Sequence, residues 1–172
     1  GRYILDEAAK TCCEIQQYIP DFRMNINVSY VQIMNGNVER DILDVIKRYA
    51  LKPDSIYIEM TESGFMDMTP AFCKFRKALD ENHISFVIDD FGTGYSSLSM
   101  FGHMVIDVVK LDMSFIRQKQ NENNDKMMQY IIDMCKNMNL RVLSEGVETE
   151  EQPQRMISMG CDYVQGYYYS CL

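Results

Sequence analysis

The chain has 172 residues, of which 47% are hydrophobic and 24% are charged, with only 9 glycines and 4 prolines. This composition excludes the disordered, collagen-like and low-complexity classes, and the length suits one domain with a hydrophobic core. The net charge of -8 disfavours binding to nucleic acid polymers. No run approaches ~18 apolar residues, so we expect no membrane-spanning helix and no membrane contact by this segment. We expect the segment to be cytoplasmic, whether or not the parent protein is anchored in a membrane elsewhere.

The six cysteines do not form any C-x-x-C pair, and two of them, Cys12 and Cys13, are adjacent. We therefore expect reduced thiols in a cytosolic compartment rather than a disulfide framework. The histidines His83 and His103 have no cysteine partners at ligand spacing, which argues against a zinc site.

The first half of the chain alternates helical and strand-like patterns. Apolar residues from Leu5 to Ile19 and from Val38 to Tyr49 recur at helical spacing, and Thr69-Pro70 is typical of a helix start. Period-two alternation predicts strands over Met24–Tyr30 and Ile56–Thr61.

The second half repeats this alternation. Apolar residues from Met128 to Met138 predict a helix, and Thr149-x-x-Gln152 predicts a capping box for a last helix that closes at Gly160. The predicted strands are Ser85–Ile88, Val105–Leu111, Arg141–Ser144 and Tyr163–Gln165.

Six strands separated mostly by helices predict an α/β fold with a parallel sheet. A polar residue lies at or near the end of each strand, and in a parallel β/α barrel these ends share the face that carries the active site. The alternative is that such residues only meet solvent. If the strand-end residues instead gather on one face, their side-chain oxygens would favour Mg²⁺ or Mn²⁺ over zinc or copper. The residues are Asn27, Glu59, Asp89, Lys110, Glu145 and Gln165.

At these positions the sequence resembles the EAL domain family, the bacterial phosphodiesterases that open cyclic di-GMP. The motifs occur in the family's order and cover nearly the whole chain. They are Asn27-Val28-Ser29, Glu59-Met60-Thr61-Glu62, Asp89-Asp90-Phe91-Gly92-Thr93-Gly94-Tyr95-Ser96-Ser97-Leu98, Lys110-Leu111-Asp112, Glu145-Gly146-Val147-Glu148-Thr149 and Gln165-Gly166-Tyr167.

The resemblance implies a role for each matching residue in a two-metal site that holds Mg²⁺ or Mn²⁺. The metal ligands would be Asn27, Glu59, Asp89 and Asp90, with Asp89 bridging both ions. Lys110 would contact the attacking water or the scissile phosphate, and Glu145 would be the general base or a partner of the second metal. Asp112 and Gln165 would line the substrate pocket, and Glu62 would tether the loop at positions 91–97.

The chain also departs from the family pattern. It contains no Glu-Ala-Leu tripeptide. From the resemblance we expect residues 1–172 to form an EAL domain that lacks its first two barrel strands and its closing helix. We therefore expect a partial (β/α)8 TIM-like barrel of six βα units, with weak or no activity on its own. The two edges of an open barrel leave backbone hydrogen-bonding groups unpaired. We therefore expect these edges to pair with a second copy of the chain or with a further part of a longer chain.

Two functions follow from the resemblance. The first is metal-dependent hydrolysis of cyclic di-GMP to linear pGpG in bacterial second-messenger signalling. The alternative is a non-catalytic EAL-like module that binds cyclic di-GMP or a protein partner. The family also implies a homodimer and an upstream GGDEF or sensory domain as partners.

Overall fold

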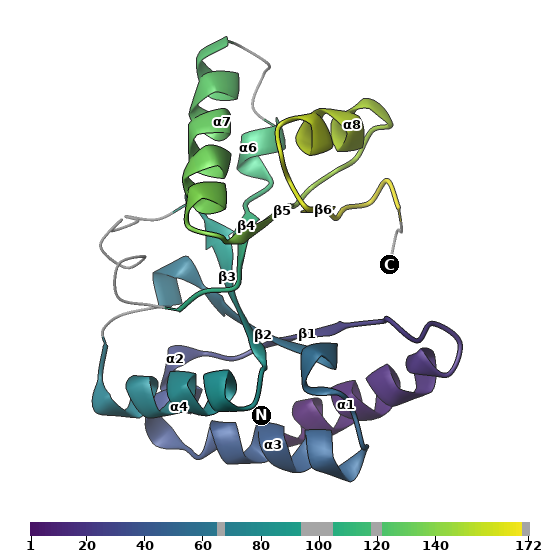
Figure 1. Cartoon of the computed structure of the whole chain (residues 1–172), viewed down its shortest axis with the longest axis vertical. Coiled ribbons are helices and arrows are strands. Elements are labelled where there is room, and N and C mark those ends of the chain that lie inside the picture. Colours follow the sequence, from purple (N-terminus) through teal and green to yellow (C-terminus); the bar gives the residue numbers. More distant parts are fainter. Residues whose placement is uncertain (65–67, 94–104, 118–121, 170–172) are drawn as a thin grey trace. The chain divides into compact units, whose positions relative to one another are not determined.

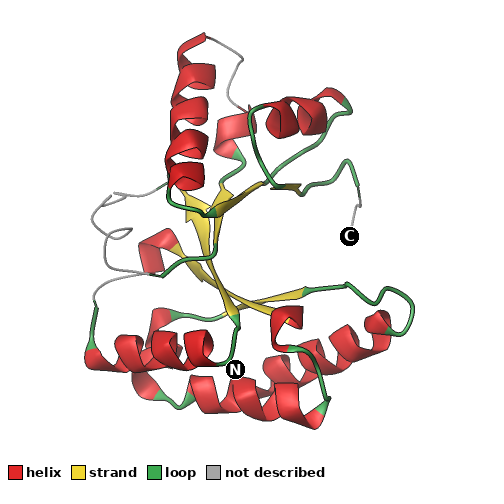
Figure 2. Cartoon of the chain, in the orientation of Figure 1, coloured by secondary structure: helices red, strands yellow, loops and turns green. Residues whose placement is uncertain are grey.

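The computed structural model describes residues 1–64, 68–93, 105–117 and 122–169. The chain divides into two compact units, Gly1–Val87 and Ile88–Leu172, and the strand β3 (Ser85–Phe91) belongs to both. Helices and strands alternate along the chain, as the sequence predicts (Figures 1 and 2). In the sheet the strands follow the order β1-β2-β3-β4-β5-β6, which is their order along the chain.

The first unit pairs strands β1 and β2 in parallel, with Met24 opposite Ile56 and Asn27 opposite Glu59. The helix α1 packs against α3 and β1, and α2 packs against α4. The elements of the first unit are α1 (Arg2–Gln16), β1 (Met24–Asn27), α2 (Tyr30–Asn35), α3 (Val38–Arg48), the 3-10 helix η1 (Pro53–Ser55), β2 (Ile56–Thr61), the 3-10 helix η2 (Glu62–Gly64) and α4 (Pro70–Glu81).

Local sequence explains why α4 begins where it does. The hydroxyl of Thr69 accepts a hydrogen bond from the backbone N–H of Phe72 at 3.2 Å, and Pro70 occupies the first helical position. Phe72, Phe75 and Leu79 then lie on the buried face of the helix. The predicted helix start is confirmed.

The second unit pairs β4 with β5 and β5 with β6, again in parallel, and Lys110 lies opposite Leu143. The helix α7 packs against β5, and α8 packs against β6. Its elements after β3 are β4 (Val108–Leu111), α6 (Ser114–Arg117), α7 (Glu122–Asn137), β5 (Arg141–Ser144), α8 (Glu151–Ser158) and β6 (Tyr163–Val164).

The strand predicted over Met24–Tyr30 is too long, because it ends at Asn27 and a helix that the sequence reasoning missed begins at Tyr30. Ser29 accepts a hydrogen bond from the N–H of Gln32, and the Gln32 side chain accepts one from the N–H of Ser29. This capping box stabilises the start of α2 and stops the strand.

Two predicted helix boundaries were also wrong. The helix α1 stops at Gln16, so Ile19 is 55% exposed, and Met138 lies beyond α7 with 40% exposure. The last helix ends at Ser158 and closes at Gly160 as predicted, because Gly160 has a left-handed φ of 103° and its N–H donates to the Ile157 carbonyl at 3.0 Å. Pro153 is the third residue of α8, where its missing N–H interrupts no intrahelical hydrogen bond.

The strand predicted over Val105–Leu111 begins only at Val108.

Five described cysteines are free thiols, and burial raises the pKa of Cys135 to about 11 and that of Cys161 to about 12. Within the described ranges, none of the helices combines the length and the apolar character that crossing a bilayer requires.

Candidate functional site

Three strands of the second unit bring oppositely charged side chains together. Lys110 Nζ lies 2.9 Å from Asp89 Oδ1 and 2.7 Å from Glu145 Oε1. Asp89 lies near the end of β3, Lys110 lies in β4, and Glu145 directly follows β5. The backbone N–H of Glu145 donates to the carbonyl of Leu111 at 3.1 Å, which fixes the glutamate beside the end of β4.

Asp90 adds a third carboxylate to this group. The ligand oxygens of Asp89, Asp90 and Glu145 all lie within 4.8 Å of one another. The backbone of Asp90 has a φ of 54°, and its N–H donates to Asp89 Oδ1 at 3.0 Å. Burial and then the neighbouring negative charge of Asp89 raise the pKa of Asp90, while Lys110 opposes the shift. A bound cation would offset the electrostatic repulsion between carboxylates that lie this close together.

The pKa of Glu145 is also raised. Burial is the largest cause, and the hydrogen bond and charge of Lys110 only partly offset it. A carboxylate with a raised pKa is a stronger base than an exposed one, so Glu145 is better suited than a surface glutamate to accept a proton from water.

Gln165 and Asp112 border the same group. Gln165, which follows β6, donates from Nε2 to Glu145 Oε1 at 3.0 Å. Asp112 Oδ1 accepts the N–H of Ser114 at 2.9 Å, at the start of α6. The charge of Asp112 contributes to the raised pKa of Asp90.

The first unit holds the other two predicted metal ligands, Asn27 and Glu59, directly opposite each other on β1 and β2. The side chain of Glu59 is buried, with 4% exposure. Asn25 Nδ2 donates a hydrogen bond to Glu59 Oε1 at 2.6 Å. The sequence reasoning assigned no role to Asn25, although period-two alternation places it on the same face of the strand as Asn27.

Glu62 begins η2 and is buried, with 7% exposure. The loop that it was predicted to tether covers positions 91–97, and residues 94–97 lie outside the described part of the chain. The tether therefore stays a prediction.

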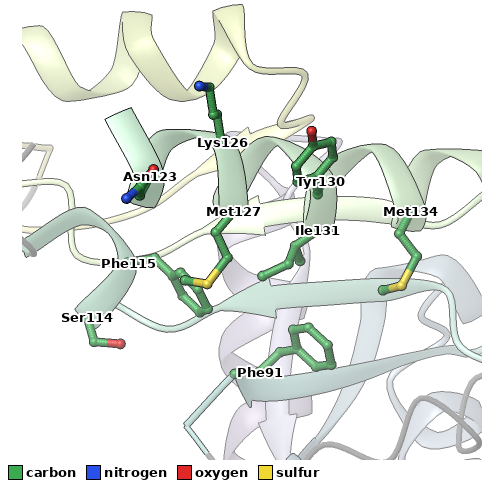
Figure 3. A pocket seen from close by; sticks show the side chains of 10 residues that line it. Phe91, Ser114, Phe115, Asn123, Lys126, Met127, Tyr130, Ile131 and Met134 are labelled. Atoms are coloured by element: carbon green, nitrogen blue, oxygen red, sulfur yellow. The ribbon is translucent and has the colours of Figure 1, made fainter. Parts of the chain in front are cut away.

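A cavity of about 690 Å³ lies in the second unit among the end of β3, α6 and α7 (Figure 3). Its lining is largely apolar and includes Phe91, Phe115, Met127 and Ile131. The carboxylates of the acidic group are not among its lining residues, so this cavity is separate from the candidate metal centre.

The acidic group fits a divalent cation. Its donors are oxygens only, which suits Mg²⁺ or Mn²⁺, and three of them converge within reach of one ion. Lys110 supplies one positive charge to a group of three carboxylates, so negative charge remains to attract a cation.

Comparisons with known proteins identify relatives of the chain. A family model described as "EAL domain" matches residues 1–171. The chain is 36% identical over 99% of its length to the signaling protein YkoW of Bacillus subtilis, of which it covers 21%. It is 29% identical over 98% of its length to the cyclic di-GMP phosphodiesterase PdeL of Escherichia coli, of which it covers 47%. The chain thus spans less than half the length of either relative.

Solved structures show the same fold. The EAL enzyme Bd1971, in its form with cAMP and cyclic di-GMP bound, has a TM-score of 0.92 and 28% identity, with 99% of this chain and 48% of that chain covered. The manganese and cyclic di-GMP complex of Klebsiella pneumoniae BlrP1 has a TM-score of 0.80 and 26% identity, with coverages of 97% and 43%. The expected EAL-type α/β fold, a partial TIM-like barrel, is confirmed.

Proposed function

Because the chain belongs to the EAL domain family, we propose that it carries the catalytic residues of a metal-dependent phosphodiesterase that hydrolyses cyclic di-GMP to linear pGpG. One observation carries this proposal: Lys110 lies between Asp89 and Glu145, at the ends of three parallel strands, with Asp90 beside them. The name of PdeL and the cyclic di-GMP complexes of Bd1971 and BlrP1 support the choice of substrate.

The metal ligands in this proposal are Asn27, Glu59, Asp89 and Asp90, as the family resemblance assigns them. Two Mg²⁺ or Mn²⁺ ions bound there would polarise the phosphate and lower the pKa of the attacking water. The oxygens of Asp89 and Asp90, which converge beside that of Glu145, support such a site, as does the manganese in the BlrP1 complex.

Glu145 is the general base in this proposal. Its carboxylate accepts a proton from water, the water oxygen forms a bond to phosphorus, and one phosphodiester P–O bond breaks. The leaving oxygen takes up a proton and becomes a ribose hydroxyl, so atoms and charges balance. Lys110 offsets the negative charge that grows on the phosphate oxygens during this step.

The remaining assignments concern substrate and partners. Gln165, through its hydrogen bond to Glu145, and Asp112, beside Asp90, would line the substrate pocket. Glu62 would hold the loop at 91–97. The partners are cyclic di-GMP, a second copy of the chain and an upstream GGDEF or sensory domain.

The test is conversion of cyclic di-GMP to linear pGpG by the full product of the gene with Mn²⁺ or Mg²⁺, followed by chromatography. We expect Glu145→Gln to lower the rate by about 10²–10⁴-fold because it removes the base. Glu150→Gln is the matched control, since Glu150 is exposed and lies outside the site.

A rate unchanged by Glu145→Gln would refute the site. Binding of cyclic di-GMP without any cleavage by the unaltered protein would instead favour the non-catalytic module. That binding is measured by calorimetry with the same protein preparation.

A further inference from the structure

Glu59 is a buried carboxylate whose position depends on hydrogen bonding. Its residue exposure is 4%, and it lies in β2, five of whose six residues are buried. An ionised carboxylate at such a place is costly unless donors or cations surround it. One donor to Oε1 is Nδ2 of Asn25, at 2.6 Å.

The backbone fixes both ends of this contact. Asn27 lies opposite Glu59 in the parallel ladder, and the N–H of Val28 donates to the Glu59 carbonyl at 2.8 Å. Asn25 lies two residues earlier on the same face of β1. The Glu59 side chain therefore reaches Asn25, which lies two positions before the ladder partner of Glu59 on β1.

An amide that donates to an anionic oxygen makes a short charge-assisted hydrogen bond, and 2.6 Å is short for a nitrogen donor. This contact restrains rotation of the carboxylate and occupies Oε1. Polar groups that hold a ligand side chain in this way typically change metal affinity or activity by about 10–100-fold.

We propose that Asn25 is a positioning residue that holds Oε1 of Glu59 and so orients the carboxylate that would bind a divalent cation. This inference rests on the proposed function, in which Glu59 is a metal ligand. Asn25 itself contacts neither metal nor substrate and acts through Glu59 alone.

The experiment is a calorimetric titration of the full chain with Mn²⁺ at one fixed pH, without substrate. Asn25→Ala and Asn25→Ser both remove the amide, and Asn25→Gln keeps it on a longer side chain. We expect the first two to weaken Mn²⁺ binding by about 10–100-fold and Asn25→Gln to recover part of that loss. Glu59→Gln should weaken the same binding step at least as much.

A matched control separates this effect from general damage. Asn37→Ala also removes an amide, from an exposed residue whose side chain makes no capping hydrogen bond, and it should leave Mn²⁺ affinity unchanged. Thermal unfolding without and with saturating Mn²⁺ gives a second measurement. A purely structural role would lower both midpoints equally, whereas a positioning role reduces the increase that Mn²⁺ causes.

Two failures are distinguishable. If Glu59→Gln weakens Mn²⁺ binding and Asn25→Ala and Asn25→Ser stay within twofold of the unaltered chain, the inference about Asn25 is wrong. If Glu59→Gln itself has no effect on Mn²⁺ binding, then Glu59 is not a metal ligand. In that case the inference about Asn25 and this part of the proposed function are both wrong.

Discussion

Lys110 Nζ lies 2.7 Å from Glu145 Oε1, and the two side chains are only 5% and 14% exposed. Water therefore screens this ion pair weakly, and the attraction is stronger than at the surface. The same ammonium group lies 2.9 Å from Asp89, so one lysine serves two carboxylates that would otherwise repel each other. In the proposed function, stability and catalysis thus depend on the same contact.

Lys110→Met keeps much of the side-chain length but removes the charge. We expect the free energy of unfolding to fall by about 3 kcal/mol, because two poorly solvated carboxylates lose their partner. The rate of cyclic di-GMP cleavage should fall by about 10²–10³-fold. Urea unfolding and the chromatographic assay measure the two effects. Lys77→Met, at a 75% exposed side chain, is the control, and equal behaviour of both variants would contradict the prediction.

Ser144→Ala should make the protein more stable. Among the described residues, the Ser144 hydroxyl is a buried side-chain oxygen without a hydrogen-bond partner, and the residue is 1% exposed. Removing it relieves the cost of withdrawing that group from water, which is about 1 kcal/mol. Urea unfolding measures the gain. Ser158→Ala is the control, because its exposed Oγ donates to the Arg155 carbonyl and its loss should bring no gain.

Asp162→Asn should lower stability at neutral pH. Burial tends to raise the pKa of Asp162, but the Lys136 ammonium and the N–H of Val142 outweigh it, so the pKa lies below its ordinary value. The two contacts are 2.6 and 2.7 Å long. We expect a loss of about 1 kcal/mol at pH 7.

The pH dependence of this loss follows from the direction of the shift. A lowered folded-state pKa contributes stability in full above the unfolded value, near 4, and that contribution disappears as the pH falls through the folded value. The unaltered chain and Asp162→Asn should therefore begin to converge in unfolding free energy below about pH 4 and meet once the pH is below the folded-state pKa of Asp162. A constant difference from pH 7 to pH 3 would contradict this assignment. Asp133→Asn, at an exposed aspartate, is the control and should change the unfolding free energy little at pH 7.

Gly166→Ala should disturb the site through the backbone. A Cβ at this position would lie 2.2 Å from the carbonyl oxygen and 2.3 Å from the nitrogen of Val147, and these backbone atoms cannot turn aside as a side chain does. We expect a stability loss of about 2 kcal/mol. The cleavage rate should also fall, since neighbouring Gln165 would shift relative to Glu145.

Gly160→Ala is the matched control for Gly166→Ala. Its φ of 103° disfavours alanine by about 1–2 kcal/mol, but the added Cβ would meet only Ile132 Cγ2 at 3.4 Å. It should therefore reduce stability with no change in turnover. Thermal unfolding and the cleavage assay, run on both variants, separate the two effects.

Local patterns were sufficient to predict much of the fold. The range of β2, the N-terminus of α4 at Thr69-Pro70 and the alternation of strands with helices all follow from residues close in sequence. Such features depend on capping, fixed φ values and apolar periodicity, which act over a few residues. The capping box of Ser29 and Gln32 was also visible in the sequence, but the alternating pattern of the preceding strand concealed it.

The sequence by itself also determined which residues are candidates for the site, because Asp89, Asp90, Lys110 and Glu145 stand at strand ends in the family's motifs. Only the tertiary structure decided their partners. Lys110 and Glu145 are 35 positions apart, and parallel pairing of β4 and β5 with a fixed register brings their charges within 2.7 Å. Likewise, the contact of Asn25 with Glu59 depends on the ladder between β1 and β2. Sequence spacing does not encode such distances, because they result from register and burial across elements that the chain joins only through long connections.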